Sequence, residues 1–259
     1  MQTEDEILFE AKQGIAIITL NRPHRRNALT NPQMLRLGEM ITTASRQSDL
    51  RAILLTGSGD KAFCVGADLT PGDTPFKPDF SRLRLPFAEL LRAGKNCDIP
   101  IIGRINGDCM AGGMGLLGIC DIAIASDTAR FALSEVKIGL FPMQVIAVLR
   151  DTLPPRVLAD MSYTGRFVAA AEAIGLGLIN RVVPASQLEE AVDAVLADIR
   201  RASPAALRRG RYALRAMESM SFEGMIAFAE TQVGPMILTD DAREGLEAFN
   251  QKRKPNWAI

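Results

Sequence analysis

His24 is the only histidine in the 259-residue sequence, and this limits the chemistry available to the chain. A Ser-His-Asp triad would have to use this one imidazole, and a metal site with several histidine ligands is impossible. The four cysteines are widely spaced without a C-x-x-C pair, so they predict reduced, mostly buried thiols and no metal site. Catalysis must therefore rest on carboxylates, backbone N–H groups or other polar groups.

Glu135 is the candidate acid and base. It follows a strand-like run at residues 130–133 and precedes the apolar segment 138–140. A carboxylate that lines a pocket and is partly removed from water has a raised pKa, which suits proton transfer near neutral pH. The alternative interpretation is a solvated carboxylate at the end of a strand.

Two glycine-containing loops could bring backbone N–H groups close to a ligand. Gly66 lies in the segment 62–69, and Gly112 and Gly113 lie at the end of the segment 105–113. Glycine allows close approach because it has no Cβ atom. Taken alone, each loop is explained equally by a tight turn or by close packing of a helix on a strand.

A third glycine motif, at residues 57–62, matches G-x-G-x-x-A and raises the possibility of a dinucleotide-binding fold. Pro71 and Gly72 would stop the following helix too early. A proline-rich segment lies where the ribose-binding acid should end a second strand. We therefore interpret residues 57–62 as a turn from a strand into a loop.

The pattern of apolar residues predicts an α/β fold with mainly parallel strands. The segments on either side of Gln13-Gly14 predict a hairpin, and isoleucine-rich runs predict strands that are buried on both faces. These strands are expected at residues 7–12, 15–20, 52–56, 99–105 and 122–125.

Helices are predicted between and after these strands. Asn31 is a candidate cap with Pro32 at the first helical position, and Ser203-Pro204 forms a similar pair. The helices are expected from residue 31, near 83–94, and at 186–201 and 204–217. We expect residues 71–86 to form a mobile loop, and we interpret the arginines between 200 and 215 as the outer faces of C-terminal helices.

Four segments in this order resemble the crotonase superfamily, also called the enoyl-CoA hydratase/isomerase family. The segments lie at 18–29, 62–69, 105–121 and 131–139, and residues 244–254 extend the resemblance to the C-terminus. The resemblance implies a spiral core of repeated ββα units with a C-terminal helical region. We expect the acyl-CoA-binding core at 1–200 and the helical region, for oligomerisation and pocket cover, at 201–259.

The resemblance also implies a mechanism. Two backbone N–H groups would stabilise the oxygen of a thioester enolate, and they map to Ala67 and Gly112. Glu135 maps to a catalytic carboxylate. The resemblance further places these residues at the substrate: Arg25, Ala28, Gly66, Ala67, Asp68, Leu69, Gly113, Gly115, Met143, Phe249 and Lys252.

Coenzyme A would be part of the substrate, so no separate cofactor is expected. Arg25 and its neighbours are expected to lie near the nucleotide. Lys252 matches a lysine that reaches the phosphates, sometimes across a subunit boundary, and Phe249 matches a contact on the adenine side. The apolar segment 141–146, which includes Met143, is expected to line the acyl pocket under a lid at 71–82, although ordinary helix core explains it equally well.

The sequence departs from two-carboxylate hydratases at Gly115, where those relatives carry a second glutamate. One carboxylate suffices to move a proton between two carbons, so the sequence favours double-bond isomerisation. Hydration with a replacement acid stays open, from the C-terminal helices or from Asp108 if it turns inward. A catalytically silent acyl-CoA-binding protein is a further alternative. Met143 occupies the position of the aspartate of dienoyl isomerases, which disfavours that activity.

Charge and composition bear on the partners. Thirty basic residues balance thirty acidic ones, and aromatic residues are only 5%, so nucleic acid and anionic membranes are not expected partners. The N-terminal segment resembles no signal peptide, and we expect a cytoplasmic protein. The resemblance implies a homotrimer or a dimer of trimers.

Overall fold

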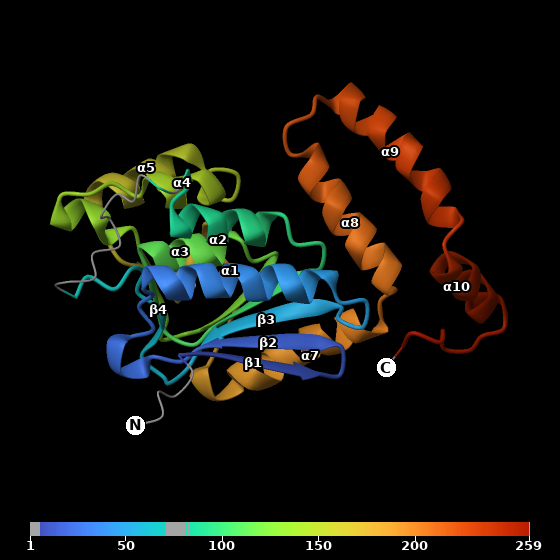
Figure 1. Ribbon diagram of the computed structural model, residues 1–259, viewed down its shortest axis with the longest axis horizontal. Helices are drawn as coiled ribbons and strands as arrows, with labels where there is room; N and C mark the ends of the chain where they lie inside the picture. Colours follow the sequence, from blue (N-terminus) through green and yellow to red (C-terminus); the bar gives the residue numbers. More distant parts are fainter. Residues whose placement is uncertain (1–5, 71–80, 82, 259) are drawn as a thin grey trace.

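The computed structural model describes residues 6–70, 81 and 83–258, and its strands form two sheets (Figure 1). The larger sheet has the order β1-β2-β3-β5-β7-β10, and the smaller has the order β4-β6-β8-β9. The strands of the larger sheet are β1 (Ile7–Lys12), β2 (Ile15–Leu20), β3 (Ala52–Gly57), β5 (Ile101–Ile105), β7 (Ile122–Ser126) and β10 (Arg181–Val183). Those of the smaller are β4 (Ala62–Cys64), β6 (Asp108–Met110), β8 (Arg130–Ala132) and β9 (Val168–Ala169).

The larger sheet is buried on both faces, as the isoleucine-rich runs predict. All its pairs are parallel except the hairpin β1–β2. Alternate residues along β3 belong to different cores: Ile53 and Leu55 pack with α1 (Asn31–Arg46), whereas Leu54 packs with α7 (Leu188–Arg201). This period of two is what a strand between two helical layers requires.

From β3 to β8, consecutive strands alternate between the two sheets, and one or more helices follow each pair of strands. β3 leads into β4, β5 into β6, and β7 into β8, so each passage adds one strand to each sheet. The intervening and following helices are α2 (Pro86–Lys95), α3 (Gly112–Gly118), α4 (Met143–Leu149), α5 (Pro155–Thr164) and α6 (Ala170–Gly175). The predicted turn at 57–62 is confirmed as the link from β3 to β4.

Several predicted element ends are wrong by a few residues. The cap of α1 is Thr30, and Asn31 is already helical; the backbone N–H of Thr30 donates to Gln33 Oε1 at 2.8 Å. The helix expected near 83–94 begins at Pro86, because proline is favoured in the first turn. The predicted lid and loop at 71–86 lie largely outside the described residues, which omit 71–80 and 82.

Three helices follow the core and extend away from the sheets (Figure 1). They are α8 (Pro204–Met217), α9 (Phe222–Ile237) and α10 (Asp240–Asn250). Ser203 caps α8 as predicted, since its hydroxyl accepts from Ala206 N at 3.0 Å. The division into domains at residue 200 stays a prediction.

The prediction that the arginines of α8 form an outer face is wrong for three of them. Arg208 donates to the carbonyl of Ser45 in the last turn of α1 and to those of Gln47 and Leu50 beyond it. Arg211 is buried and binds Asp121 and the carbonyls of Gly94 and Cys97. Arg215 donates to the carbonyls of Lys95 and Cys97. Free carbonyls at helix ends attract cationic side chains, and this is what turns them inward.

Candidate active site

Three parallel strands of the smaller sheet end at one edge, and the predicted catalytic groups follow them. β4, β6 and β8 pair in parallel, so their carboxyl ends meet. Ala67 follows β4, Gly112 follows β6 and Glu135 follows β8, each within three residues of the strand's end. The topology therefore brings three groups that are distant in sequence to the same edge.

Gly66 and Gly112 are in direct contact at this edge. The φ angle of Gly66 is +97°, a value that residues with a Cβ atom rarely adopt. A Cβ atom added to Gly66 would lie 2.7 Å from the backbone nitrogen of Gly112. Only glycine therefore lets the loop after β4 approach the start of α3 so closely.

No hydrogen bond among the described residues uses the N–H groups of Ala67 and Gly112. Leu29 bridges to Ala67 by donating its N–H to Gly66 O at 2.8 Å and accepting from Asp68 N at 2.9 Å. The N–H of Ala67 itself therefore points away from Leu29, and no described residue accepts it. Gly112 is the first residue of α3, where N–H groups have no partner within the helix.

Ala111 holds the turn before Gly112 in a strained conformation. Its φ angle is +46°, which is unfavourable for a residue with a Cβ atom. Its N–H donates to Ala132 O at the end of β8, at 2.9 Å, and this bond fixes the turn. Backbone strain of this kind concentrates at ligand-binding and catalytic sites.

Glu135 carries a buried carboxylate oxygen without a partner. The residue lies in the 3-10 helix η2 (Ser134–Ile138), and no described residue donates to its Oε2 atom. Burial raises the pKa of Glu135, and a hydrogen bond from its own backbone N–H partly opposes this effect. Because buried polar atoms are nearly always paired, this oxygen is a candidate to meet a ligand.

Gly113 and Gly115 have different surroundings from Gly112. A Cβ atom at Gly113 would lie 2.1 Å from Cys64 O, so this glycine allows α3 to pack on β4. A Cβ atom at Gly115 would lie 2.7 Å from Cζ of Phe87. The substrate-binding roles of both glycines stay predictions.

Asp68 fixes the loop that carries Ala67. Its carboxylate pairs with Arg22 Nη1 at 2.8 Å and accepts from the Thr70 hydroxyl at 2.6 Å. The Thr70 hydrogen bond is the main cause that lowers the pKa of Asp68. Ala28, also buried, accepts from Arg22 Nη1 through its carbonyl at 2.8 Å. Arg22 thus ties the segments around Ala28 and Asp68 together.

The structure does not turn Asp108 toward the candidate site. Its Oδ1 accepts from Arg130 Nε at 2.9 Å, and its Oδ2 accepts from Arg130 Nη2 at 2.8 Å. Arg26 Nη1 lies 3.5 Å from the same Oδ2. Because Arg130 binds both oxygens, Asp108 is an ion-pair partner in this structure and not the inward acid that we considered.

The remaining predicted residues lie at the surface. Arg25 ends the 3-10 helix η1 (Pro23–Arg25), and Leu69 and Met143 are 52% and 69% exposed. Phe249 on α10 is 81% exposed, and Lys252 follows that helix with a φ angle of +54°. Figure 1 shows α10 at the opposite end of the molecule from α3 and β4. The structure therefore does not bring Phe249 and Lys252 to Glu135 of the same chain.

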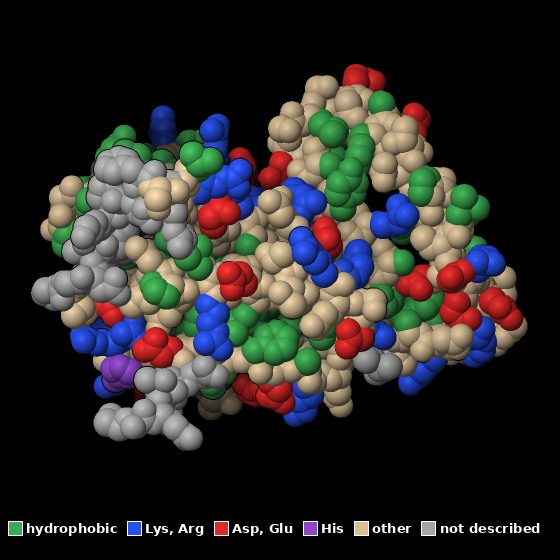
Figure 2. Space-filling model, in the orientation of Figure 1, with side chains coloured by type: hydrophobic (Ala, Val, Ile, Leu, Met, Phe, Trp, Pro, Cys, Tyr) green, Lys and Arg blue, Asp and Glu red, His purple; other side chains and the backbone are tan. Residues whose placement is uncertain are grey.

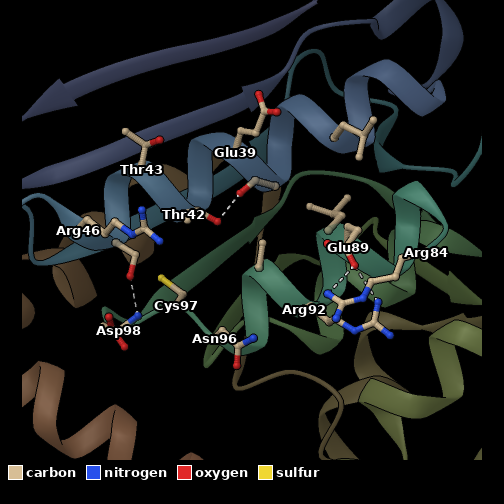
Figure 3. A pocket seen from close by; sticks show the side chains of 15 residues that line it. Glu39, Thr42, Thr43, Arg46, Arg84, Glu89, Arg92, Asn96, Cys97 and Asp98 are labelled. Atoms are coloured by element: carbon tan, nitrogen blue, oxygen red, sulfur yellow. Dashed lines mark hydrogen bonds and ion pairs between the residues drawn. The ribbon is translucent and has the colours of Figure 1, made fainter. Parts of the chain in front are cut away.

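A separate groove of about 590 Å³ lies between α1 and α2 (Figure 3). Arg84 and Arg92 both bind Glu89 on one side of it, and Glu39 and Arg46 line the other. None of the predicted catalytic residues lines this groove. The groove is therefore distinct from the strand edge that carries Glu135.

Sequence reasoning missed Phe87, the second residue of α2. If residue 115 carried a Cβ atom, Phe87 would be the side chain nearest to that atom. No local signal identifies it, because the two residues lie on different helices.

Among the described residues, no cluster of three or more histidine, cysteine or acidic side chains could hold a metal ion. The described helices include none that is long and apolar enough to cross a membrane.

Comparisons with known proteins show which family and which relatives this sequence matches. Residues 10–258 match the family described as "Enoyl-CoA hydratase/isomerase". The chain is 34% identical to enoyl-CoA hydratase EchA19 of Mycobacterium tuberculosis, with 99% of this chain and 98% of that protein covered. It is 30% identical to (E)-benzylidenesuccinyl-CoA hydratase of Thauera aromatica, with 96% and 97% covered.

The fold matches solved structures as well. The crystal structure of enoyl-CoA hydratase from Mycobacterium smegmatis superposes with a TM-score of 0.92 at 32% identity, covering 99% of this chain and 100% of that one. A crotonase-type enoyl-CoA hydratase/isomerase structure from Legionella pneumophila has a TM-score of 0.88 at 26% identity, with 97% and 98% covered. The predicted fold class is therefore confirmed.

Proposed function

Because the chain belongs to the enoyl-CoA hydratase/isomerase family, we propose that it is an enzyme that shifts the double bond of an enoyl-CoA thioester. The observation that carries the proposal is the buried, unpaired Oε2 of Glu135 at the strand edge that also holds Ala67 and Gly112. Gly115 supplies no second carboxylate, and Asp108 is bound by Arg130.

The reaction needs one proton-transfer group and an oxyanion site. Glu135, ionised, removes a proton from C2 of a 3-enoyl-CoA. The electron pair moves toward the thioester carbonyl, whose oxygen gains negative charge. The N–H groups of Ala67 and Gly112 stabilise that oxygen. The protonated Glu135 then returns the proton to C4, and the product is a 2-enoyl-CoA, with no water consumed.

Hydration is the second candidate, and the names of the relatives favour it. EchA19 and the Thauera aromatica protein are both described as hydratases. Hydration would use the same oxyanion site, with Glu135 activating water and also supplying the α-proton. This route asks one carboxylate to perform both steps, which is why we place it second.

We also propose that a second copy of the chain completes the coenzyme A site. Phe249 lies on α10 and Lys252 just after it, and α10 is at the opposite end of the molecule from α3 and β4 (Figure 1). Lys252 has a left-handed backbone, and the neighbouring Arg253 is held by Glu244, so the end of α10 is well fixed. In a trimer or a dimer of trimers, α10 would offer these side chains to the nucleotide of a neighbouring subunit.

A panel of acyl-CoA substrates tests the reaction. The protein is incubated separately with 2-enoyl-CoA and 3-enoyl-CoA thioesters of several chain lengths, and hydration and isomerisation are followed independently. We expect 3-enoyl-CoA to be converted to 2-enoyl-CoA faster than either is hydrated. Faster hydration would favour the second candidate, and tight binding without turnover would favour a catalytically silent protein.

A further inference from the structure

The aromatic ring of Phe87 occupies the space beside the start of α3. It lies at the N-terminal end of α2, which is anchored because a Cβ atom at Gly38 of α1 would lie 3.4 Å from Leu90 Cα. The Phe87 side chain is partly buried and packs against the main core. The packing of α2 on α1 and on the core therefore holds the ring in place.

One ring covers two glycines on the same face of α3. Cβ atoms built at Gly112 and Gly115 would lie 3.5 Å and 2.7 Å from Phe87 Cζ. Residues three apart are neighbours on a helix surface, so the ring spans the first turn of α3. The first of these glycines carries the N–H that we assign to the oxyanion.

We propose that Phe87 determines the reaction by excluding water and a second acid from this side of the site. This inference rests on the proposed function. An oxyanion held by Gly112 would have the apolar ring beside it. Hydration would need an ordered water in the place that this ring occupies. The same ring fills the space that a carboxylate at position 115 would enter. Phe87 thus acts as a specificity-determining residue that favours proton return by Glu135 over the addition of water.

A thermal-unfolding cycle tests the contact without any substrate. Gly115→Ala is made in the parent and in the Phe87→Ala variant. We expect Gly115→Ala to lower the melting temperature in the parent, because the new Cβ atom meets the ring. In Phe87→Ala it should raise the melting temperature, because alanine stabilises a helix relative to glycine. Equal shifts in both backgrounds would show that Phe87 does not occupy this space.

Product analysis then tests the chemical role. We expect Phe87→Ala to raise the ratio of hydration to isomerisation at least tenfold, and Gly115→Glu to raise it further in that background but not in the parent. Leu91→Ala is the matched control, since Leu91 Cδ2 lies 3.3 Å from the same built Cβ atom at Gly115 and is not among the atoms nearest to Gly112.

The outcomes separate this inference from the proposed function. An unchanged product ratio in Phe87→Ala, or an equal change in Leu91→Ala, would overturn the role of Phe87 while leaving isomerisation intact. A parent protein that turns over neither substrate would contradict the proposed function. In that case the melting temperatures still decide whether Phe87 fills the space beside Gly115.

Discussion

Glu135 must change its charge during the proposed reaction, and its surroundings favour the neutral form. Burial removes water from the carboxylate, and no described residue donates to its Oε2 atom. An ionised carboxylate in such a place is a stronger base than one in water, because its pKa is raised. The local environment therefore suits a group that takes up a proton and later returns it.

Replacing Glu135 by glutamine tests this role directly. Glu135→Gln has nearly the same shape but cannot accept a proton, so we expect kcat for isomerisation to fall by about 10²–10⁴. Binding of acyl-CoA, measured by calorimetry, should persist because the thioester would be held by backbone donors and phosphate contacts. A folded variant that turns over at the parent rate would show that Glu135 is only a charge at a strand end.

The same substitution should alter how stability depends on pH. An unfolded glutamate has a pKa of about 4.3, and the folded pKa of Glu135 is higher. Between these values the folded state binds more protons than the unfolded state, so this group lowers stability as pH rises. We expect Glu135→Gln to raise the melting temperature more at pH 7 than at pH 4. Glu10→Gln, at an exposed position on β1, is the control; a pH-independent difference for Glu135→Gln would contradict the assignment.

Gly112 allows the oxyanion donor to be tested with a matched pair. Gly112→Pro deletes the N–H, and proline is tolerated at the first position of a helix. Gly112→Ala keeps the N–H while adding a Cβ atom 3.2 Å from Gly66 Cα. We expect the proline variant to lose about 10²–10³ in kcat relative to the alanine variant. Equal activities in two folded variants would remove Gly112 from the mechanism.

At the scale of elements, arginines attach the C-terminal helices to the core. Arg208, Arg211 and Arg215 of α8 donate to carbonyls at the ends of α1 and α2. These bonds use charge to satisfy carbonyls that the helices leave free. Nucleic-acid binding through this cluster would require these guanidinium groups to leave their partners.

Removing one of these arginines should loosen α8. Arg211→Met keeps the apolar stem but deletes the bonds to Asp121 and to two carbonyls. We expect the free energy of unfolding to fall by about 1–3 kcal/mol, since one partly exposed carboxylate and two carbonyls lose their donor. Arg209→Met changes an exposed arginine on the same helix and should alter stability by no more than about 0.5 kcal/mol. The free energies of unfolding of both variants are measured in urea. Equal values for the two variants would contradict this expectation.

Local signals predicted the elements better than the contacts between them. The hairpin has the predicted bounds because Gln13 and Gly14, with φ angles of +48° and +74°, form a two-residue turn in which glycine adopts a positive φ angle without cost. The direction of Arg211 and the contact of Phe87 with Gly115 depend instead on how separate helices pack. No spacing within one segment encodes such contacts. The resemblance indicated the three catalytic candidates, and the parallel order of β4, β6 and β8 explains why they meet.

At the scale of the whole molecule, the C-terminal region exposes apolar surface that a single chain does not cover. Figure 2 shows hydrophobic side chains at the surface of the region formed by α8 and α9. No residue of α9 is fully buried. Four apolar side chains on α9 are between 45% and 66% exposed: Phe222, Ile226, Val233 and Ile237. Their spacings of four, seven and four residues place them on one stripe of the helix.

We expect this stripe to pack against another copy of the chain, because contiguous exposed apolar surface marks interaction sites. Val233→Glu combined with Ile237→Glu would place two charges in the interface and should shift the sedimenting species toward the monomer at micromolar concentration. Thr231→Glu is the control, since it adds charge two residues away, on the other side of α9. If α10 completes a neighbouring coenzyme A site, the double variant should also bind acyl-CoA more weakly, although Glu135 and Gly112 are unchanged. A parent protein that sediments as a monomer, or a double variant that keeps the parent assembly, would contradict this arrangement.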